Sequence, residues 1–314
     1  MARPRPPLDR SGGKSGSKSG AKPGDFRGGP RRGPERGPDR GPERAVRPDK
    51  PQRTERREHA APFEKPRDAD SNLEKVFGKH SVRAVFLARP HSVRRLVIAG
   101  QENYHENLLK LASENGVEHE FMDWPVFNRL GGFTEEDKHQ GVMCFVEPKP
   151  QLGDRDLAEH LDKDGCVLVL DQISNPQNLA TIIRGAAFFG ASGVLVMKNR
   201  SAEVTPTVSR YAVGGTEFVD VFTITNIAQA LESLKALGYW AYGLDERGDA
   251  TMAQADFAPR SAFVIGAEGE GLRPKTRKFC DVLVRIPGGR AGVESINAAV
   301  AASVALAEFT RLQS

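Results

Sequence analysis

The sequence predicts an α/β protein with two folded domains, a small α/β module followed by a larger domain built on a parallel sheet. In the larger part, short apolar segments alternate with segments of helical periodicity, which is typical of parallel strands covered by helices on both faces. A segment of low apolar content precedes both domains. We therefore expect a tail over residues 1–70, a small domain over residues 72–148 and a large domain over residues 155–314.

The tail is dominated by Gly, Pro, Ser, Arg and Lys, and its only aromatic residues are Phe26 and Phe63. Such a segment buries too little apolar surface to offset the entropy cost of ordering, so we expect it to be disordered. Met1–Arg67 carries a net charge of +10, whereas Asp68–Ser314 carries −6. Two interpretations stay open: the tail only keeps the protein in solution, or it is a flexible arm that attracts RNA phosphates.

The small module is expected to contain strands and at least one helix. Val93–Ala99 alternates between polar and apolar residues, as a strand does, and the leucines of Asn107–Glu114 recur at helical spacing. Asn115 and Gly116 end that helix. Further strands are expected at Val117–Met122 and Gly141–Val146, and Pro148–Asp154 is expected to be a linker.

The large domain is expected to place its ligands at the carboxyl ends of parallel strands. The expected strands are Cys166–Leu170, Gly193–Met197, Trp240–Gly243, Ala262–Ile265 and Val282–Ile286, and the expected helices are Gln177–Phe189, Ile227–Leu237 and Ser295–Leu312.

Three cysteines, Cys144, Cys166 and Cys280, lie in or beside apolar segments, with no CxxC pair and no nearby His cluster. We expect them to be small buried side chains, neither disulfide partners nor metal ligands, in a reducing environment. No apolar run approaches the roughly 18 residues that a membrane span needs. The expected location is therefore the cytoplasm.

Three polar segments follow expected strand ends. Asn175–Arg184 reads NPQNLATIIR, and its Asn178 and Arg184 are expected to face one crevice from the first turns of a helix. The alternative is that Asn178 caps the helix and Arg184 is a surface charge.

The second segment, Ile265–Leu272, spaces its glycines as G-x-x-G-x-G, which differs from the dinucleotide-binding pattern. Its two glutamates disfavour binding of a polyanion and favour binding of a cation or of a ligand with hydroxyl groups. The third segment, Ile286–Asn297, is a glycine-rich loop in which Ser295 is placed to cap the last helix. That helix is rich in alanine, so we expect it to pack closely on another backbone.

In their order and spacing these segments resemble the three motifs of the SpoU (TrmH-like) RNA 2′-O-methyltransferases. Phe77–Val82 and His139–Val142 resemble the opening and closing signatures of the small RNA-binding domain of that family. The chain departs from the family pattern at Ala180, at Gly288 and in a third loop that is one residue longer. The resemblance covers about three quarters of the chain.

The resemblance implies a trefoil-knotted methyltransferase domain, an exception to the rule against knots, and a homodimer. It implies S-adenosyl-L-methionine as cofactor, no metal, and RNA, in particular large-subunit ribosomal RNA, as substrate. By similarity, the cofactor contacts the backbone at Gly266, Ile286 and Ile296. The implied catalytic residues are Asn178, Arg184, Glu268, Ser295 and Asn297.

General chemistry adds roles to two of these residues. A guanidinium hardly ever loses its proton, so we expect Arg184 to hold an RNA phosphate, whose oxygen helps to accept the proton of the 2′-hydroxyl. Glu268 is expected to organise its loop in preference to acting as the base.

Other functions stay open as alternatives. They are a transfer-RNA 2′-O-methyltransferase and a non-catalytic RNA-binding protein associated with ribosomes. A nucleotide-dependent oxidoreductase is disfavoured, because Asn175–Arg184 contains no glycine after the first strand.

Overall fold

A computed structural model describes residues 72–100, 105–135, 137–161, 163–288 and 295–313. These residues belong to one compact unit. The predicted tail, residues 1–70, lies outside the described residues, and its disorder stays a prediction.

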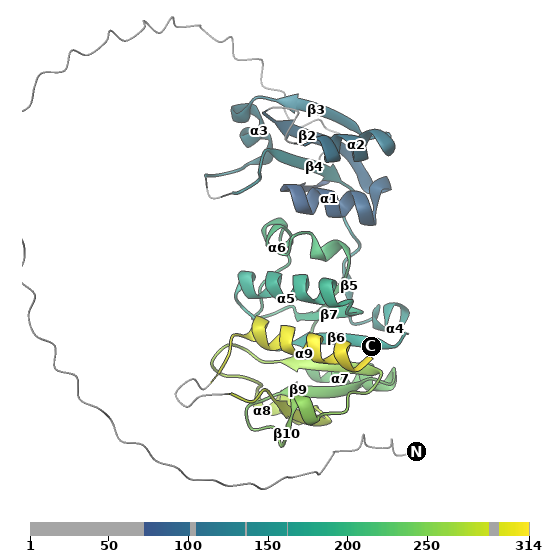
Figure 1. Cartoon of the computed structure of the whole chain (residues 1–314), viewed down its shortest axis with the longest axis vertical. Helices are drawn as coiled ribbons and strands as arrows, with labels where there is room; N and C mark the ends of the chain where they lie inside the picture. The colour runs from purple at the N-terminus through teal and green to yellow at the C-terminus, as the bar shows by residue number, and fades with distance from the viewer. Residues whose placement is uncertain (1–71, 101–104, 136, 162, 289–294, 314) are drawn as a thin grey trace, which may run out of the picture. The chain divides into compact units, whose positions relative to one another are not determined.

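The small domain is a mixed four-stranded sheet in the order β1-β4-β2-β3, with helices packed against it (Figure 1). Strands β2 and β3 are parallel, and the other two pairs are antiparallel. The strands are β1 (Glu74–Phe77), β2 (Val93–Ala99), β3 (Glu118–Met122) and β4 (Val142–Val146), and the helices are α1 (Lys79–Ala88), α2 (Glu106–Glu114) and α3 (Trp124–Gly131).

The large domain contains an eight-stranded sheet in the order β10-β12-β9-β11-β6-β7-β8-β5, and every pair is parallel. The predicted parallel sheet is therefore confirmed. Its strands are β5 (Leu152–Gly153), β6 (Gly165–Leu170), β7 (Gly193–Met197), β8 (Asp220–Ile224), β9 (Trp240–Leu244), β10 (Ala250–Thr251), β11 (Arg260–Ile265) and β12 (Val282–Arg285). Its α-helices are α4 (Leu157–His160), α5 (Pro176–Phe189), α6 (Pro206–Tyr211), α7 (Ile227–Ala236), α8 (Pro274–Arg277) and α9 (Ala298–Gln313).

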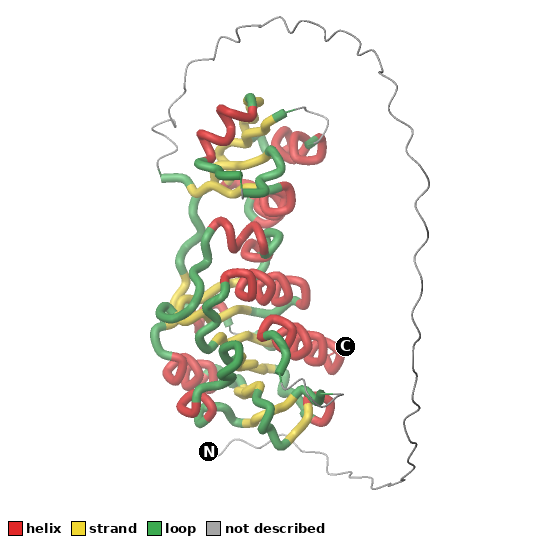
Figure 2. Tube along the Cα trace, turned by 90° about the vertical axis from the view of Figure 1, so that its left-hand side faces the viewer, coloured by secondary structure: helices red, strands yellow, loops and turns green. Residues whose placement is uncertain are grey.

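Both faces of this sheet are covered by helices, as Figure 2 shows. In β6, Leu168 and Leu170 point into a core shared with α5 and α9, whereas Val167 and Val169 point into a core shared with α7. Side chains of successive strand residues point to opposite faces, so a strand buried on both faces is apolar throughout. This explains the unbroken apolar segments of the sequence.

Several elements differ from the sequence prediction. The expected linker contains the short strand β5, which pairs with β8 at the edge of the sheet. Helix α9 begins at Ala298 and not at Ser295, because the side chain of Asn297 caps it by accepting the backbone N–H groups of Ala299 at 2.8 Å and Val300 at 3.3 Å. The knot stays a prediction, since the segment that would thread it includes residues 289–294, outside the described part of the chain.

Two of the three cysteines have the buried environment that the sequence predicts. Cys144 and Cys166 are buried, and Cys280 is half-buried. Burial raises the pKa of the Cys166 and Cys280 thiols to about 12, so both are protonated at neutral pH. Within the described ranges, the His, Cys, Asp and Glu residues form no cluster of three that would hold a metal ion. None of the helices described here is long and apolar enough to cross a membrane.

Candidate active site

The three polar segments meet at one end of the parallel sheet. Strands β6 and β11 are neighbours, so the segment after β6 lies beside the loop after β11. A cavity of about 240 Å³ opens there, and the segment after β12 forms its other wall. The residues from the sequence prediction that line it are Gly266, Glu268, Ile286, Ser295 and Ile296.

A hydrogen-bond network joins the three segments. Glu268 Oε1 accepts from Asn178 Nδ2 at 2.6 Å and from Asn297 Nδ2 at 2.5 Å. Asn297 Nδ2 also lies 3.1 Å from Asn178 Oδ1, which accepts from it. Three of the five predicted catalytic residues are therefore in direct contact, although any two of them are at least 29 positions apart in the chain.

Asn178 is free for this role because another residue caps its helix. Asn175 Oδ1 accepts the backbone N–H of Gln177 at 2.8 Å, and Pro176 occupies the first helical position. Asn178 stands further along the first turn, 9% exposed, with its amide directed at Glu268. Its interpretation as a helix cap is wrong.

The loop after β11 is a tight turn that presents Glu268. Its ends are closed by a hydrogen bond from the N–H of Gly271 to the carbonyl of Ala267, at 2.9 Å. A Cβ on Gly266 would lie 2.1 Å from the carbonyl carbon of Gly271, so only glycine fits under the returning backbone. The fold of the loop therefore requires glycine at position 266, whether or not a ligand contacts it.

Arg184 does not join this network. It follows Asn178 by six residues, which turns its side chain about 240° around the helix axis, and it is exposed. Its Cα instead lies against Gly215, where an added Cβ would approach to 3.2 Å. That Asn178 and Arg184 face one crevice stays a prediction.

Sequence reasoning missed two ion pairs that hold the loop after β11 in place. Asp171, directly after β6, lies 2.6 Å from Arg273, and Asp245, after β9, lies 2.7 Å from Arg277. Both carboxylates are buried. Because β6 and β9 lie on either side of β11, residues that follow these two strands hold the chain just beyond the β11 loop. A signal was present in the sequence: an Asp just after an apolar strand, with arginines just after the glycine-rich loop.

The walls of the cavity combine apolar and acidic groups. Leu244, Ile265 and Val284 supply apolar surface. Its charged residues are Asp245, Glu246, Glu268 and Glu270 and two arginines, of which Arg247 lies 3.7 Å from Glu246 and Arg277 lies 2.7 Å from Asp245. Because two of the four carboxylates are paired with arginines, Glu268 and Glu270 are the carboxylates that can attract a cation or accept hydrogen bonds from hydroxyl groups. The sequence-based expectation for the second segment agrees with this lining.

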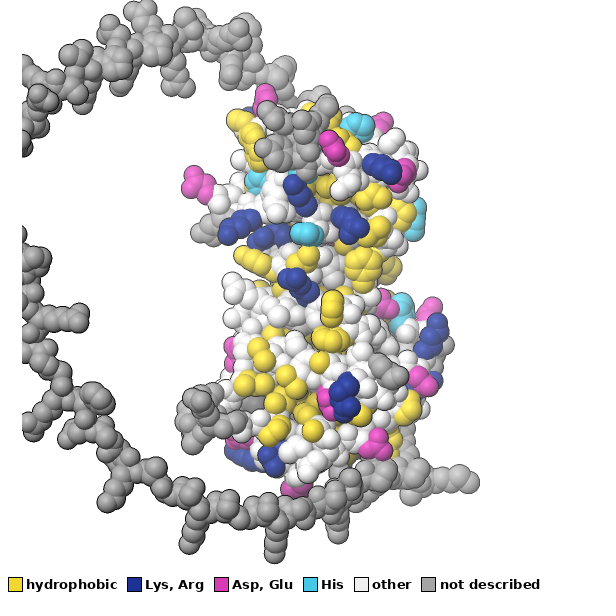
Figure 3. All heavy atoms as spheres, viewed as in Figure 1, with side chains coloured by type: hydrophobic (Ala, Val, Ile, Leu, Met, Phe, Trp, Pro, Cys, Tyr) yellow, Lys and Arg dark blue, Asp and Glu magenta, His cyan; other side chains and the backbone are white. Residues whose placement is uncertain are grey.

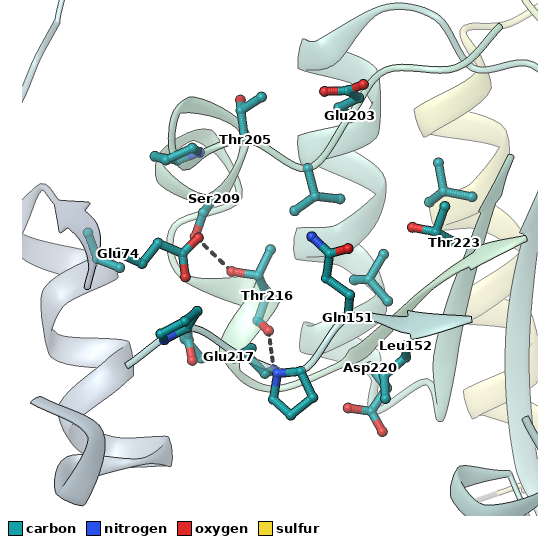
Figure 4. A pocket seen from close by; sticks show the side chains of 18 of the residues that line it. Glu74, Gln151, Leu152, Glu203, Thr205, Ser209, Thr216, Glu217, Asp220 and Thr223 are labelled. Atoms are coloured by element: carbon teal, nitrogen blue, oxygen red, sulfur yellow. Dashed lines mark hydrogen bonds between the residues drawn. The ribbon is translucent and has the colours of Figure 1, made fainter. Parts of the chain in front are cut away.

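A larger cavity, of about 460 Å³, contains none of the predicted site residues. Its walls include Gln151, Thr205, Thr216 and Thr223, and Ser209 contacts Thr216 there at 2.7 Å (Figure 4). Its lining combines hydroxyl groups with side chains of both charges, and this combination points to no particular reaction. The smaller cavity is therefore the candidate active site.

Comparison with known proteins agrees with this assignment. Residues 165–307 match the model of the SpoU rRNA Methylase family, and residues 75–152 match that of the RNA 2′-O ribose methyltransferase substrate-binding domain. The 23S rRNA (guanosine-2′-O-)-methyltransferase RlmB of Pseudomonas syringae pv. tomato is 36% identical over 254 residues, covering 78% of this chain and 98% of that protein. The same-named protein of Neisseria meningitidis is 35% identical, covering 77% and 96%.

A solved structure shares the fold as well. The SpoU methyltransferase AviRb from Streptomyces viridochromogenes, in complex with the cofactor AdoMet, superposes with a TM-score of 0.64 at 25% identity, covering 78% of this chain and 92% of that one. Fold and site together define an RNA methyltransferase of the α/β type with an added substrate-binding domain. The chain belongs to the SpoU rRNA methylase family.

Replacing Glu268 by Gln separates the two roles that its carboxylate can have. The Gln carbonyl can still accept from Asn178 and Asn297, so methyl transfer by Glu268→Gln should stay within about threefold of the wild type, whereas Glu268→Ala should lose about tenfold or more. Single-turnover rates measure both. A general base contributes about a hundredfold or more, so equal and severe loss in the two variants would instead identify Glu268 as the base.

Proposed function

We propose that this protein transfers a methyl group from S-adenosyl-L-methionine to a ribose 2′-hydroxyl of large-subunit ribosomal RNA. The observation that carries the proposal is the network in which Glu268 joins Asn178 and Asn297 at the rim of the cavity. The relatives that are 35–36% identical along almost their whole length carry the corresponding activity in their names, which supports the same substrate class.

The cavity fits the cofactor. The carboxylates of Glu268 and Glu270 suit a sulfonium and ribose hydroxyls, and Gly266, Ile286 and Ile296 are among the lining residues, which supports the cofactor contacts that the resemblance implies. Bound there, S-adenosyl-L-methionine would supply an activated methyl group.

The residues of the chain would align and desolvate the reacting groups, which accounts for most of the rate in such a displacement. Hydrogen bonds among Asn178, Glu268 and Asn297 hold the three segments in fixed positions. Ser295 adds a hydroxyl group to the lining of the cavity. Arg184, outside the network, binds an RNA phosphate, and an oxygen of that phosphate helps to accept the hydroxyl proton. The oxygen–methyl bond forms as the sulfur–methyl bond breaks.

We also propose that the protein is a cytoplasmic homodimer. Phe188 on α5 is 82% exposed and Val300 on α9 is 51% exposed, and these two helices pack side by side. Figure 3 shows hydrophobic side chains gathered over this region. An apolar patch of this kind is expected to be covered by another protein surface, and a second copy of the same chain fits the family resemblance.

The reaction is tested with tritiated cofactor and ribosomal RNA. Label should enter RNA and not protein without added metal, and an RNA carrying 2′-deoxyribose at the mapped nucleotide should take up none. Mapping of ribose methylation in a deletion strain names that nucleotide. Label that persists in the deoxy substrate would overturn the assignment to the 2′-hydroxyl.

Arg184→Ala should abolish turnover while cofactor affinity stays within a few-fold, because Arg184 lies outside the cavity and acts on the RNA side. Calorimetric titration of cofactor and single-turnover kinetics give the two quantities. Arg184→Lys keeps the charge and should recover only part of the rate, since it loses bidentate contact with a phosphate. Parallel loss of affinity and turnover would show that Arg184 shapes the pocket.

Phe188→Asp should convert the dimer to monomer, because it places a charge in the proposed interface. Sedimentation velocity reports the mass, and Phe121→Asp, another exposed phenylalanine on the small domain, is the matched control. A wild-type protein that sediments as a monomer would contradict the dimer proposal.

A further inference from the structure

The two signatures of the small domain meet at one end of its sheet, although the catalytic cavity uses neither. The backbone N–H of Gly78 donates to the carbonyl of Val142 at 3.0 Å, and the backbone N–H of Lys79 donates to Gln140 Oε1 at 3.0 Å. Gln140 adopts a left-handed conformation with φ 56°, which is uncommon for a residue with a side chain. The fold therefore constrains this loop closely.

Trp124 lies at the same end of the sheet and is 48% exposed. Its ring rests on glycine backbone: a Cβ at Gly141 would lie 2.9 Å from its Cη2, and a Cβ at Gly100 would lie 3.4 Å from its Nε1. Phe127 and His139 contact it with ring centroids 6.3 Å and 5.7 Å away. One side of the indole is thus fixed by the fold while much of the ring remains open to solvent.

Positive charge lies along the neighbouring helix. Lys79 and Arg83 are four residues apart on α1, so they share one face of the helix, and Arg83 is exposed. On α6, the guanidinium of Arg210 lies 4.1 Å from the ring centroid of Tyr211 and 5.9 Å from that of Phe77. Figure 3 shows Lys and Arg side chains gathered over α1 and α6.

The basic helix leads toward the catalytic arginine. A Cβ on Gly214 would lie 2.3 Å from the Cβ of Ala84, so α1 packs directly on the Gly214–Gly215 turn. The next residue, Gly215, packs against the Cα of Arg184. The chain from Asp68 onward has a net charge of −6, yet this part of its surface gathers cations.

An exposed aromatic ring beside a row of cations is the arrangement by which proteins bind single-stranded nucleic acid, because bases stack on the ring and cations contact phosphates. We propose that the α1–Trp124 surface, formed by Lys79, Arg83, Trp124, Gln140 and Arg210, binds an unpaired segment of the RNA substrate. A base stacks on Trp124, and the phosphates follow α1 toward Arg184. This inference rests on the proposed function in taking RNA as the substrate.

The fluorescence of Trp124 tests base stacking directly. The chain has a second tryptophan, so the measurement uses the full chain with Trp240→Phe, and a short single-stranded RNA of mixed sequence is added without cofactor. Stacking should quench the emission in a saturable way and less so at high salt. Absence of quenching at concentrations where the RNA is bound would overturn the placement of a base on Trp124.

Substitutions test the contribution of the surface to affinity. Trp124→Ala should weaken binding of the same RNA by about tenfold, and Trp124→Phe should restore most of it, because base stacking on an aromatic ring is tolerant of the ring type. Phe121→Ala, at an exposed phenylalanine of β3, is the control and should have little effect. Unfolding midpoints of all variants should be compared, since Trp124 also covers glycine backbone.

Charge reversal tests the path of the phosphates. Arg83→Glu should lower the affinity for RNA and reduce the slope of affinity against salt, whereas Lys110→Glu, also a charge reversal but on α2, should alter neither. Equal effects of the two changes would mean that only total charge matters and would refute the surface. These binding data are independent of methyl transfer. A protein that binds RNA at this surface but transfers no methyl group would refute the proposed function alone. Unchanged RNA affinity in the Trp124 and Arg83 variants, with methyl transfer intact, would refute the surface alone. A Trp124→Ala variant that changes sedimentation in place of RNA affinity would assign the surface to a protein partner.

Discussion

The carboxylate of Glu268 is the contact on which the geometry of the site depends. It accepts hydrogen bonds from side chains that follow two other strands, Asn178 after β6 and Asn297 after β12. A charged acceptor forms stronger hydrogen bonds than a neutral one, so a single group can hold three loops in one register. The geometry of the candidate site is thereby fixed across segments that lie far apart in the chain.

Two ion pairs with buried carboxylates support this contact from the sheet. Asp171 and Asp245 stand at the ends of the strands that flank β11, and they hold Arg273 and Arg277 just past the loop that carries Glu268. Removing either arginine would leave a buried carboxylate unpaired, which costs about 3–5 kcal/mol. The loop is therefore anchored on both sides by the sheet, and Gly266 lets it turn tightly enough to bring Glu268 to Asn178 and Asn297.

The sequence predicts the large domain well because its strands are buried on both faces, and continuous apolar segments mark them clearly. The bounds of β7 agree with the prediction, and those of β6 differ by one residue. The motif residues are also recognisable, and three of them meet as expected. A local sequence pattern does not predict an element that is stabilised by residues distant in the chain. Short elements such as β5 and α6 depend on tertiary contacts, and Asn297 replaces Ser295 as the cap because the Glu268 network positions it.

Arg184 shows a different limit of sequence reasoning. The spacing of a motif identifies its residues but not the direction of their side chains. Arg184 follows Asn178 by six residues on a helix, so the two side chains leave the helix axis in different directions. The structure places Arg184 beside the Gly214–Gly215 turn, against which the small domain packs. In the proposed mechanism the two domains contribute in different ways: the cavity holds the cofactor, and the basic surface that leads to Arg184 binds RNA.

The most direct test of the central contact is a double-mutant cycle of Asn178→Ala and Glu268→Ala, read as the affinity for S-adenosyl-L-methionine by calorimetry. If the hydrogen bond between these residues organises the cofactor pocket, the two losses will be strongly non-additive, with a coupling free energy of about 0.5–3 kcal/mol. Losses that add to within about 0.5 kcal/mol would show that the residues act independently and would contradict the account.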